Sequence, residues 1–309
     1  MQQIAVIGAG LIGRAWAIVF ARAGMAVRLW DPVPAATAAA RGFIAERLPE
    51  LREAALLADP PETVLARIEA CATLEQALDG AVYVQENGPE RVADKQALFA
   101  RMDALAPPET LLASSTSGIP ASAFTEHLPG RGRCLVAHPV NPPYLVPLVE
   151  LCPAPWTTPE TMAQARALMQ AAGQVPATLN REITGFVLNR LQIALVSEAF
   201  RLVADGVMSA EDVDATVKHG LGLRWSFMGP FETIDLNAPG GVADYCARYG
   251  GLYAEVQQQT TPRPLTDAVV GPIDAGRRTV LPLAAQPERQ AWRDRRLMAL
   301  LAHKAGQPE

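Results

Sequence analysis

Cysteine is scarce in this 309-residue sequence, and no two of its cysteines have the spacing of a metal or redox motif. The four lie far apart in the chain, at Cys71, Cys134, Cys152 and Cys246. Without a C-x-x-C pair, the sequence predicts neither a zinc site nor a set of disulfides, and we expect no metal. This use of cysteine is typical of a reducing compartment, so we expect a cytoplasmic protein.

Positive charge and long apolar runs are also in short supply. The 32 Asp and Glu residues outnumber the 27 Lys and Arg residues, which excludes the basic field that nucleic acid or anionic lipid would require. Arg, Asp or Pro interrupts each apolar run before it reaches the ~20 residues of a membrane-spanning helix. Residues 1–6 lead directly into an apolar strand, which leaves no room for a signal or transit peptide. We therefore expect a soluble protein without a nucleic-acid or membrane partner.

The first half of the chain alternates short apolar runs with longer amphipathic segments. This alternation is typical of a parallel sheet with crossover helices. The expected strands are 4–7, 26–30, 81–85, 111–114, 134–137 and 148–151. The expected helices between them include 13–23, 35–57 and 95–105. We predict an α/β fold with an N-terminal Rossmann-type doubly wound sheet and a mostly α-helical C-terminal domain.

The pattern changes after Thr157. A helix is expected at 159–172, a short strand at 175–179, and a long helix with an apolar stripe at 185–205. We place the domain boundary near Ile183, with an NAD-binding Rossmann domain over 1–183 and a helical substrate and dimerisation domain over 184–309. The segment 260–287 is rich in Pro, Gly and Asp, so we expect a loop there before a last helix at 288–302.

A glycine-rich motif, G-x-G-x-x-G, follows the first expected strand and opens a helix. Its glycines provide a tight turn, close approach of a pyrophosphate and close packing of helix on strand, and the helix N-terminus favours phosphate. Asp31 ends the second strand, where a carboxylate accepts hydrogen bonds from the ribose hydroxyls and repels a 2′-phosphate; the alternative is a turn residue before Pro32. The expected NAD-binding residues of this motif are Gly8, Gly10, Leu11, Ile12, Gly13 and Asp31.

A histidine and a glutamate stand where hydride-transfer chemistry needs an acid/base pair. His138 is the one histidine at the C-terminal end of an expected sheet strand, and removal of a hydride from a carbinol carbon requires a base for the hydroxyl proton. Glu150, at the end of the next strand, can orient the imidazole and stabilise its protonated form. Taken alone, His138 could also be a purely structural histidine and Glu150 a surface acid.

Two polar residues are expected to bind the reacting oxygen. Hydrogen bonds from Ser117 and Asn189 would stabilise the alkoxide that forms during oxidation. Both residues are therefore predicted catalytic and substrate-binding residues. The alternative for Asn189 is a polar residue on the solvated face of an amphipathic helix.

Four stretches resemble the 3-hydroxyacyl-CoA dehydrogenase family. They are SSTS at 114–117, AHPVNP at 137–142, LVE at 148–150 and GFVLNR at 185–190. SSTSG at 114–118, HPVNPPY at 138–144, GLGLR at 220–224 and QAWRD at 290–294 are most similar to the branch that contains lambda-crystallin and L-gulonate 3-dehydrogenase. The resemblance runs over nearly the whole chain. It implies a homodimer formed through the helical domain, and it places Glu90 and Lys95 on the cofactor side of the cleft; the alternative for these two is a solvated helix start.

Arg224 suggests the class of substrate. It precedes the stretch MGPFE at 228–232, and ordinary acyl-CoA members of the family usually lack an arginine here. A guanidinium binds a carboxylate in bidentate fashion, so we expect a free 3-hydroxy acid held by Arg224; the alternative is an arginine that covers Trp225.

The leading interpretation is therefore an NAD-dependent dehydrogenase of a small 3-hydroxy acid, similar to L-gulonate 3-dehydrogenase. Its alternatives are a 3-hydroxyacyl-CoA dehydrogenase, such as one for 3-hydroxybutyryl-CoA, and a dehydrogenase of carnitine or another 3-hydroxy acid. A crystallin-like protein or a sensor that binds NAD without turnover is the alternative from a different class. Intact Ser117, His138, Glu150 and Asn189 favour the enzyme.

Overall fold

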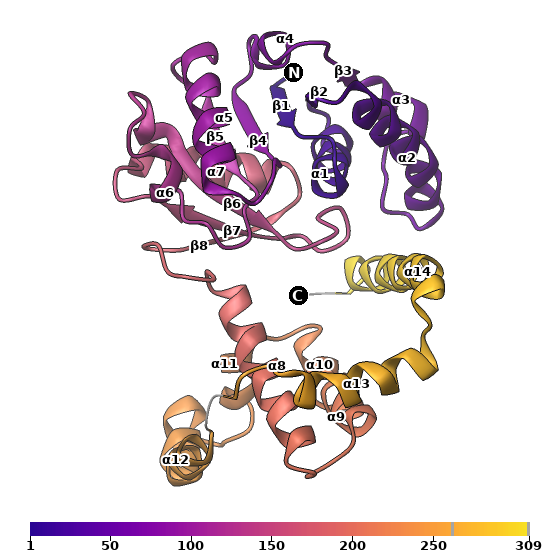
Figure 1. Cartoon of the computed structure of the whole chain (residues 1–309), viewed down its shortest axis with the longest axis vertical. Coiled ribbons are helices and arrows are strands. Elements are labelled where there is room, and N and C mark those ends of the chain that lie inside the picture. Colours follow the sequence, from indigo (N-terminus) through magenta and orange to yellow (C-terminus); the bar gives the residue numbers. More distant parts are fainter. Residues whose placement is uncertain (261–262, 308–309) are drawn as a thin grey trace. The chain divides into compact units, whose positions relative to one another are not determined.

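A computed structural model describes residues 1–260 and 263–307 (Figure 1). The chain divides into two compact units. The first unit comprises Met1–Asn189 together with Arg289–Glu309, and the second comprises Arg190–Glu288. Each unit is described by itself below.

The first unit is built on one sheet of eight strands, with helices on both sides (Figure 1). The strands are β1 (Gln3–Ile7), β2 (Ala26–Trp30), β3 (Ile68–Ala70), β4 (Tyr83–Glu86), β5 (Leu111–Ser114), β6 (Cys134–Pro139), β7 (Leu148–Pro153) and β8 (Val175–Thr178). Their order across the sheet is β3-β2-β1-β4-β5-β6-β7-β8. The chain first adds strands on one side of β1, up to β3, and then adds β4 and all later strands on the other side. This is the predicted doubly wound sheet. The strand β3 was not predicted, because it is short and has a single buried residue, Ile68.

One pair of neighbouring strands runs antiparallel, namely β6 and β7. All other neighbours in the sheet are parallel. The connection over residues 140–147 is too short for a parallel crossover, which takes about a dozen residues or more. The chain therefore turns back directly, and residues of β6 and β7 come to lie opposite each other.

Side-chain alternation along β1 explains why the sheet has two cores. Ile4 and Val6 belong to one hydrophobic cluster, while Ala5 and Ile7 belong to the other, as the two-residue period of a strand requires. The first cluster is covered by α1 (Leu11–Arg22), α2 (Pro34–Glu53), α3 (Pro61–Ala66) and α7 (Pro159–Ala171). The second is covered by α4 (Leu74–Leu78), α5 (Val92–Leu105) and α6 (Ser122–Thr125).

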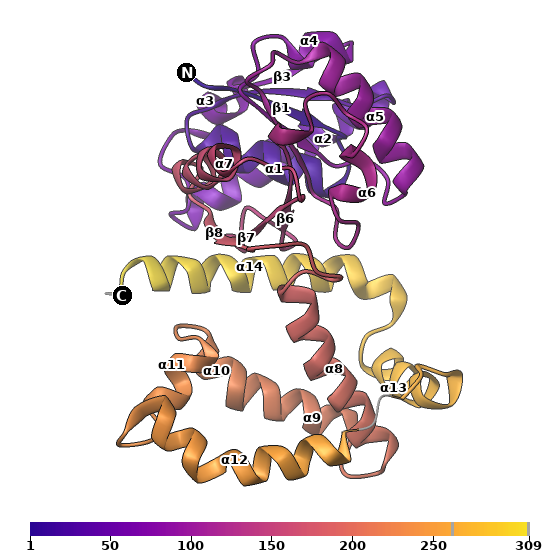
Figure 2. The same cartoon turned by 90° about the vertical axis from the view of Figure 1, so that its left-hand side faces the viewer.

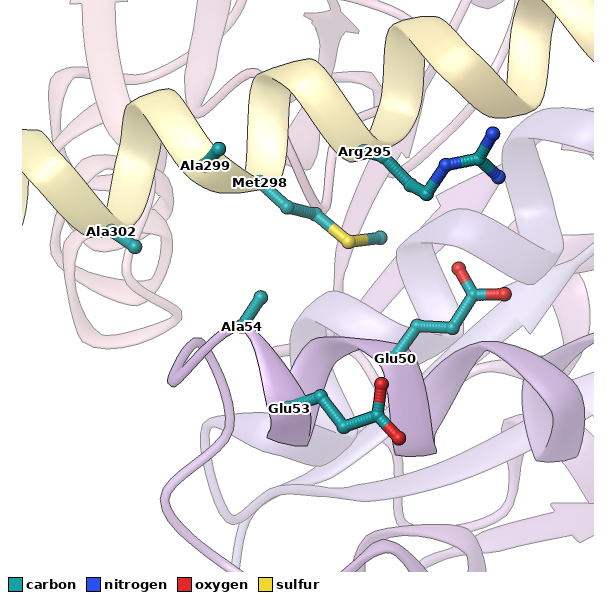
Figure 3. Close-up of a pocket in the computed structure, with 7 residues that line it drawn as sticks. All are labelled: Glu50, Glu53, Ala54, Arg295, Met298, Ala299 and Ala302. Carbon is teal, nitrogen blue, oxygen red and sulfur yellow. The ribbon is translucent and has the colours of Figure 1, made fainter.

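The last helix, α14 (Gln286–Ala305), packs with the first unit, although it was expected in the helical domain over 184–309. Met298 is 3% exposed and belongs to the same cluster as Leu48 and Leu51 of α2. Figure 3 shows Met298 pointing toward the end of α2, where Ala54 helps to line a pocket between the two helices. Apolar residues at helical spacing show that one face of a helix is buried, but they do not show against which unit. The sequence pattern alone therefore could not assign this helix to a unit.

The second unit consists of helices (Figure 2). They are α8 (Leu188–Ala204), which begins just before the unit, α9 (Ala210–Thr216), α10 (Gly222–Trp225), α11 (Pro230–Asp235), α12 (Gly241–Gln259) and α13 (Asp267–Val280). The expectation of a loop over 260–287 was wrong for α13; residues 261 and 262 lie outside the described part. Val269, Ile273 and Val280 repeat at helical spacing, and this periodicity outweighs the Pro and Gly content. Within the described residues, no helix is long and apolar enough to cross a membrane.

Candidate active site

The glycine motif forms the turn between β1 and α1. Gly8 has a φ of +93°, which favours glycine, and a Cβ on Gly13 would stand 1.8 Å from the carbonyl oxygen of Gly8. Gly10 is the residue just before α1, and a Cβ there would meet no heavy atom of the described residues within 4 Å. Gly13 therefore packs the helix on the strand, while Gly10 leaves open space at the helix N-terminus, as the approach of a dinucleotide phosphate requires.

Asp31 lies at the end of β2 with its carboxylate against the glycine turn. Oδ2 accepts a hydrogen bond of 2.8 Å from the Ala9 amide, and Oδ1 accepts one of 2.8 Å from the Val33 amide. The second bond is the contact that a turn residue before Pro32 would make. The first brings the carboxylate to the turn where Leu11 and Ile12 begin the helix. This arrangement fits the ribose-binding role of an acid in a dinucleotide fold.

His138 and Glu150 face each other across the antiparallel pair of strands. They are register partners of β6 and β7, and His138 Nδ1 lies 2.9 Å from Glu150 Oε2. Both are buried, with 5% and 3% of their surfaces exposed. Because an ionised carboxylate only accepts hydrogen bonds, Nδ1 donates, and Nε2 of the neutral ring presents a lone pair. The ring of Phe186 packs beside the imidazole, with ring centres 5.4 Å apart.

The second oxygen of Glu150 binds the start of α8. Oε1 accepts hydrogen bonds of 2.8 Å from the amides of Val187 and Leu188. Burial alone would raise the pKa of Glu150, but the hydrogen bond from His138 and the two backbone amides outweigh it and lower that pKa below its ordinary value. Glu150 is therefore ionised at neutral pH, as the partner of an imidazole base should be.

The lowered pKa predicts how acid affects folding stability. A depressed carboxyl pKa contributes stability that is complete above the unfolded pKa of about 4.3 and disappears as the pH falls through the folded pKa. The variant Glu150→Gln lacks this contribution at every pH. We expect wild type to unfold at higher urea concentration than the variant at pH 6, and this difference to shrink as the pH falls toward about 3. A difference that stays constant from pH 6 to pH 3 would contradict the lowered pKa.

The loop after β5 carries Ser117 and is held from two sides. The Ser117 amide donates to Glu90 Oε1 at 2.9 Å, and the Gly118 amide donates to the same oxygen at 3.2 Å. The Ser117 carbonyl accepts a bond of 2.7 Å from Asn189 Nδ2. Since Asn189 follows the amides that bind Glu150, hydrogen bonds connect the Ser117 loop to the His138 pair through the start of α8.

Lys95 lies behind this loop and is buried, with 1% of its side chain exposed. Its Nζ is 3.0 Å from Glu86 Oε2 and 3.8 Å from Glu90 Oε2. Glu86 was not predicted as a site residue. In the sequence, an acid beside Gln85 and Asn87 looks like a solvated side chain, and its complete burial becomes visible only in the structure.

Among the predicted catalytic residues, the structure links His138 to Glu150 and Asn189 to the loop of Ser117 by hydrogen bonds. Glu90, which was predicted to bind the cofactor, holds the same loop and lies beside Lys95, for which the same role was predicted. The roles of these residues stay predictions. Arg224 belongs to the second unit, where it lies in α10 with an exposed side chain, so its role stays a prediction. Among the described residues, no group of three His, Cys, Asp or Glu side chains could hold a metal ion.

Comparison with known proteins assigns both parts of the chain to one family. The model of the 3-hydroxyacyl-CoA dehydrogenase NAD-binding domain matches residues 3–183, and the model of the C-terminal domain of the same dehydrogenase matches residues 185–281. The chain is 42% identical to the lambda-crystallin homolog of Bos taurus, over 99% of this chain and 97% of the relative. It is 37% identical to the L-carnitine dehydrogenase of Streptomyces griseus, over 94% and 88% of the two chains.

Solved structures agree with this assignment. The NAD⁺-dependent 5-formyl-3-hydroxy-2-methylpyridine 4-carboxylic acid 5-dehydrogenase matches all of both chains with a TM-score of 0.85 and 26% identity. The 3-hydroxybutyryl-CoA dehydrogenase of Escherichia coli K12 matches 82% of this chain and 53% of its own, with a TM-score of 0.68 and 31% identity. Together with the glycine turn and the dinucleotide-type sheet, these matches confirm the predicted family, fold and cofactor. The chain therefore belongs to the 3-hydroxyacyl-CoA dehydrogenase family and is an NAD-dependent oxidoreductase that acts on a CH–OH group.

Proposed function

We propose that the protein oxidises the 3-hydroxyl of a small free hydroxy acid, as an L-gulonate 3-dehydrogenase does. The observation that carries this proposal is the buried His138–Glu150 pair on the neighbouring strands β6 and β7. His138 Nε2 would take the proton of the hydroxyl group. NAD⁺ held at the glycine turn would supply the acceptor for the hydride from the carbinol carbon. Glu150 holds the ring through Nδ1 and stabilises the positive charge that the ring gains.

Ser117 and Asn189 are proposed to bind the reacting oxygen. The Ser117 hydroxyl and the amide group of Asn189 stand on two segments that the 2.7 Å bond between them holds together. Donors that are already oriented stabilise a developing alkoxide more strongly than mobile ones, because they need no reorganisation during the reaction. The hydrogen bond that holds the Ser117 and Asn189 segments together supports their proposed role as oxygen-binding donors.

The choice of a free acid rests on Arg224 and on the relatives. Several curated relatives are L-carnitine dehydrogenases, and L-carnitine is itself a free 3-hydroxy acid. Arg224 is exposed on α10 and offers the planar guanidinium that a carboxylate binds. We propose that it holds the substrate carboxylate.

Parallel assays of NAD reduction test both parts of this proposal. L-Gulonate, (S)-3-hydroxybutyrate and (S)-3-hydroxybutyryl-CoA are compared by kcat/KM, and we expect a free acid to be preferred. Arg224→Ala should lower kcat/KM for that acid by about 10- to 100-fold, the value of a charged hydrogen-bonded contact. Arg248→Ala is the matched control, because Arg248 is an exposed arginine of the same unit that pairs with Asp244. An Arg224→Ala enzyme with the wild-type KM for the acid would exclude the carboxylate contact.

A second candidate function is the oxidation of a 3-hydroxyacyl-CoA, and the match over 82% of this chain to the 3-hydroxybutyryl-CoA dehydrogenase of Escherichia coli K12 favours it. In the assays above, a preference for the thioester would favour this candidate and leave Arg224 without its proposed role.

We also propose that a second copy of the chain covers the apolar surface of the helical unit. Large apolar side chains of this unit are exposed in the single chain, among them Leu191, Phe227, Phe231, Leu252 and Tyr253. Monomeric proteins rarely expose this much apolar surface in one small body. The family and the surface together support a homodimer, and the mass of the protein in solution is the measurement that decides it.

A further inference from the structure

Glu86 is a fully buried carboxylate that the proposed chemistry does not use. It ends β4, and none of its side chain is exposed. Its Oε1 accepts a hydrogen bond from the Gly88 amide at 2.5 Å, and its Oε2 accepts one from Ser114 Oγ at 2.5 Å. Lys95 Nζ lies 3.1 Å from Oε1 and 3.0 Å from Oε2. Both oxygens of this carboxylate therefore accept hydrogen bonds, and the donors belong to segments that lead to the proposed active-site loops.

Lys95 joins Glu86 to a second carboxylate, that of Glu90. Its Nζ donates to Ser114 Oγ at 3.3 Å and lies 3.8 Å from Glu90 Oε2. Glu90 is 47% exposed, so by itself it would be free to turn into solvent. The charges of Glu86, Lys95 and Glu90 thus alternate in sign, from a fully buried carboxylate to one that is 47% exposed.

Glu90 uses its other oxygen to hold the loop that carries Ser117. Oε1 accepts bonds from Thr116 Oγ1 at 2.5 Å and from the amides of Ser117 and Gly118. An exposed ion pair contributes little, but a pair with one partner fully buried and fixed is screened far less. The fixed position of Glu90 therefore depends on Lys95, and that of Lys95 depends on Glu86.

We propose that Glu86 is a positioning residue, which through Lys95 and Glu90 fixes the backbone of the Ser117 loop for catalysis. The proposal rests on the proposed function of Ser117. Burying an ion pair gains little stability compared with apolar residues of similar volume, so this pair is better explained by what it orients. The three residues act on the loop, and they do not themselves contact the reacting atoms.

The variant Glu86→Gln tests the proposal, because it keeps the size of the side chain and removes its charge. We expect the amides of Ser117 and Gly118 to exchange hydrogen for deuterium at least about tenfold faster, since their acceptor loses its fixed position. We expect kcat to fall by about tenfold or more, while the dissociation constant for NADH changes less than kcat does. Exchange at these two amides needs no substrate, so it tests the positioning role even if the proposed substrate class is wrong.

A double variant separates positioning from general stability. Glu86→Gln with Lys95→Met leaves no unpaired buried charge, so we expect the unfolding midpoint to recover toward that of wild type. Exchange at the Ser117 and Gly118 amides should stay fast, because Glu90 still lacks its cation. If exchange and kcat recovered along with the midpoint, the pair would serve only the fold and the proposal would be overturned.

The pair of Asp103 and Arg133 provides the matched control. It is buried in the same unit, with a distance of 2.8 Å and 7% and 11% of the two side chains exposed. Asp103→Asn should lower the unfolding midpoint and leave exchange at the Ser117 and Gly118 amides unchanged. Wild-type exchange at these amides in Glu86→Gln, or equal acceleration in Asp103→Asn, would also overturn the proposal.

Discussion

The variant His138→Asn is expected to lower kcat by about 10²- to 10⁴-fold, the range that a general base contributes. Asparagine can place its Nδ2 close to the position of Nδ1 and so keep the hydrogen bond to Glu150, which is 2.9 Å long in the wild type. It has no group that could take the substrate proton from the position of Nε2. We therefore expect the loss to appear in kcat, with the dissociation constant for NADH nearly unchanged.

The measurement compares turnover and NADH fluorescence titration in wild type, His138→Asn and His127→Asn. His127 is an exposed histidine of the same unit, so its substitution controls for the change of residue type. We expect His127→Asn to behave as wild type. Turnover by His138→Asn within about threefold of wild type would remove His138 from the chemistry and leave the pair with a structural role.

Gly13→Ala is expected to have the second large effect, which falls on the cofactor site and on stability together. The added Cβ would stand 1.8 Å from the carbonyl oxygen of Gly8, so β1 and α1 must move apart. Forcing an extra carbon into packed structure typically costs about 1–3 kcal/mol, and more where the obstacle is backbone. Because the displaced turn is the dinucleotide turn, we expect NADH affinity to fall by at least about tenfold.

Gly10→Ala serves as the comparison, because its Cβ would meet no heavy atom of the described residues within 4 Å. We expect its urea midpoint to equal that of wild type, with NADH affinity reduced only because the methyl group occupies the path of the phosphates. The two variants thus separate packing from cofactor approach. Equal urea midpoints for Gly13→Ala and wild type would show that the helix start does not have the close packing described here.

The sheet of the first unit was largely predictable from the sequence, and the reason lies in its burial. Strands covered on both faces give continuous apolar runs, as in Ile4–Ile7, and such runs are easily recognised between turn residues. The strand at Ile68–Ala70 gives no such run, because Glu69 and Ala70 are exposed. Composition was the wrong guide for α13, where spacing of the apolar residues decides the structure despite Pro272.

The candidate site was predictable only in part. His138 stands next to the last residue of β6, the kind of position where a chemical role is expected of a polar side chain. Glu150 was expected at the end of its strand, but β7 continues to Pro153, and Glu150 is the third of its six residues. Two features needed the structure: the contacts of Glu86, and the use of the Val187 and Leu188 amides by Glu150. The backbone of the motif GFVLNR at 185–190 therefore has a role that its side chains do not reveal, since two of its amides bind the carboxylate of Glu150.

Because β6 and β7 pair in antiparallel fashion, the proposed acid/base pair forms between two residues that are close together in the sequence. Both partners lie within residues 138–150, so their meeting requires closure of a short loop only, and none of the long crossovers that the rest of the sheet needs. Shifting the register of either strand by one residue would turn its side chains to the opposite face of the sheet. The connecting loop over 140–147 belongs to this module, because its Tyr144 and Leu145 are 2% exposed and lie in the first hydrophobic cluster; the loop and the two strands are therefore constrained to change together as one inherited unit.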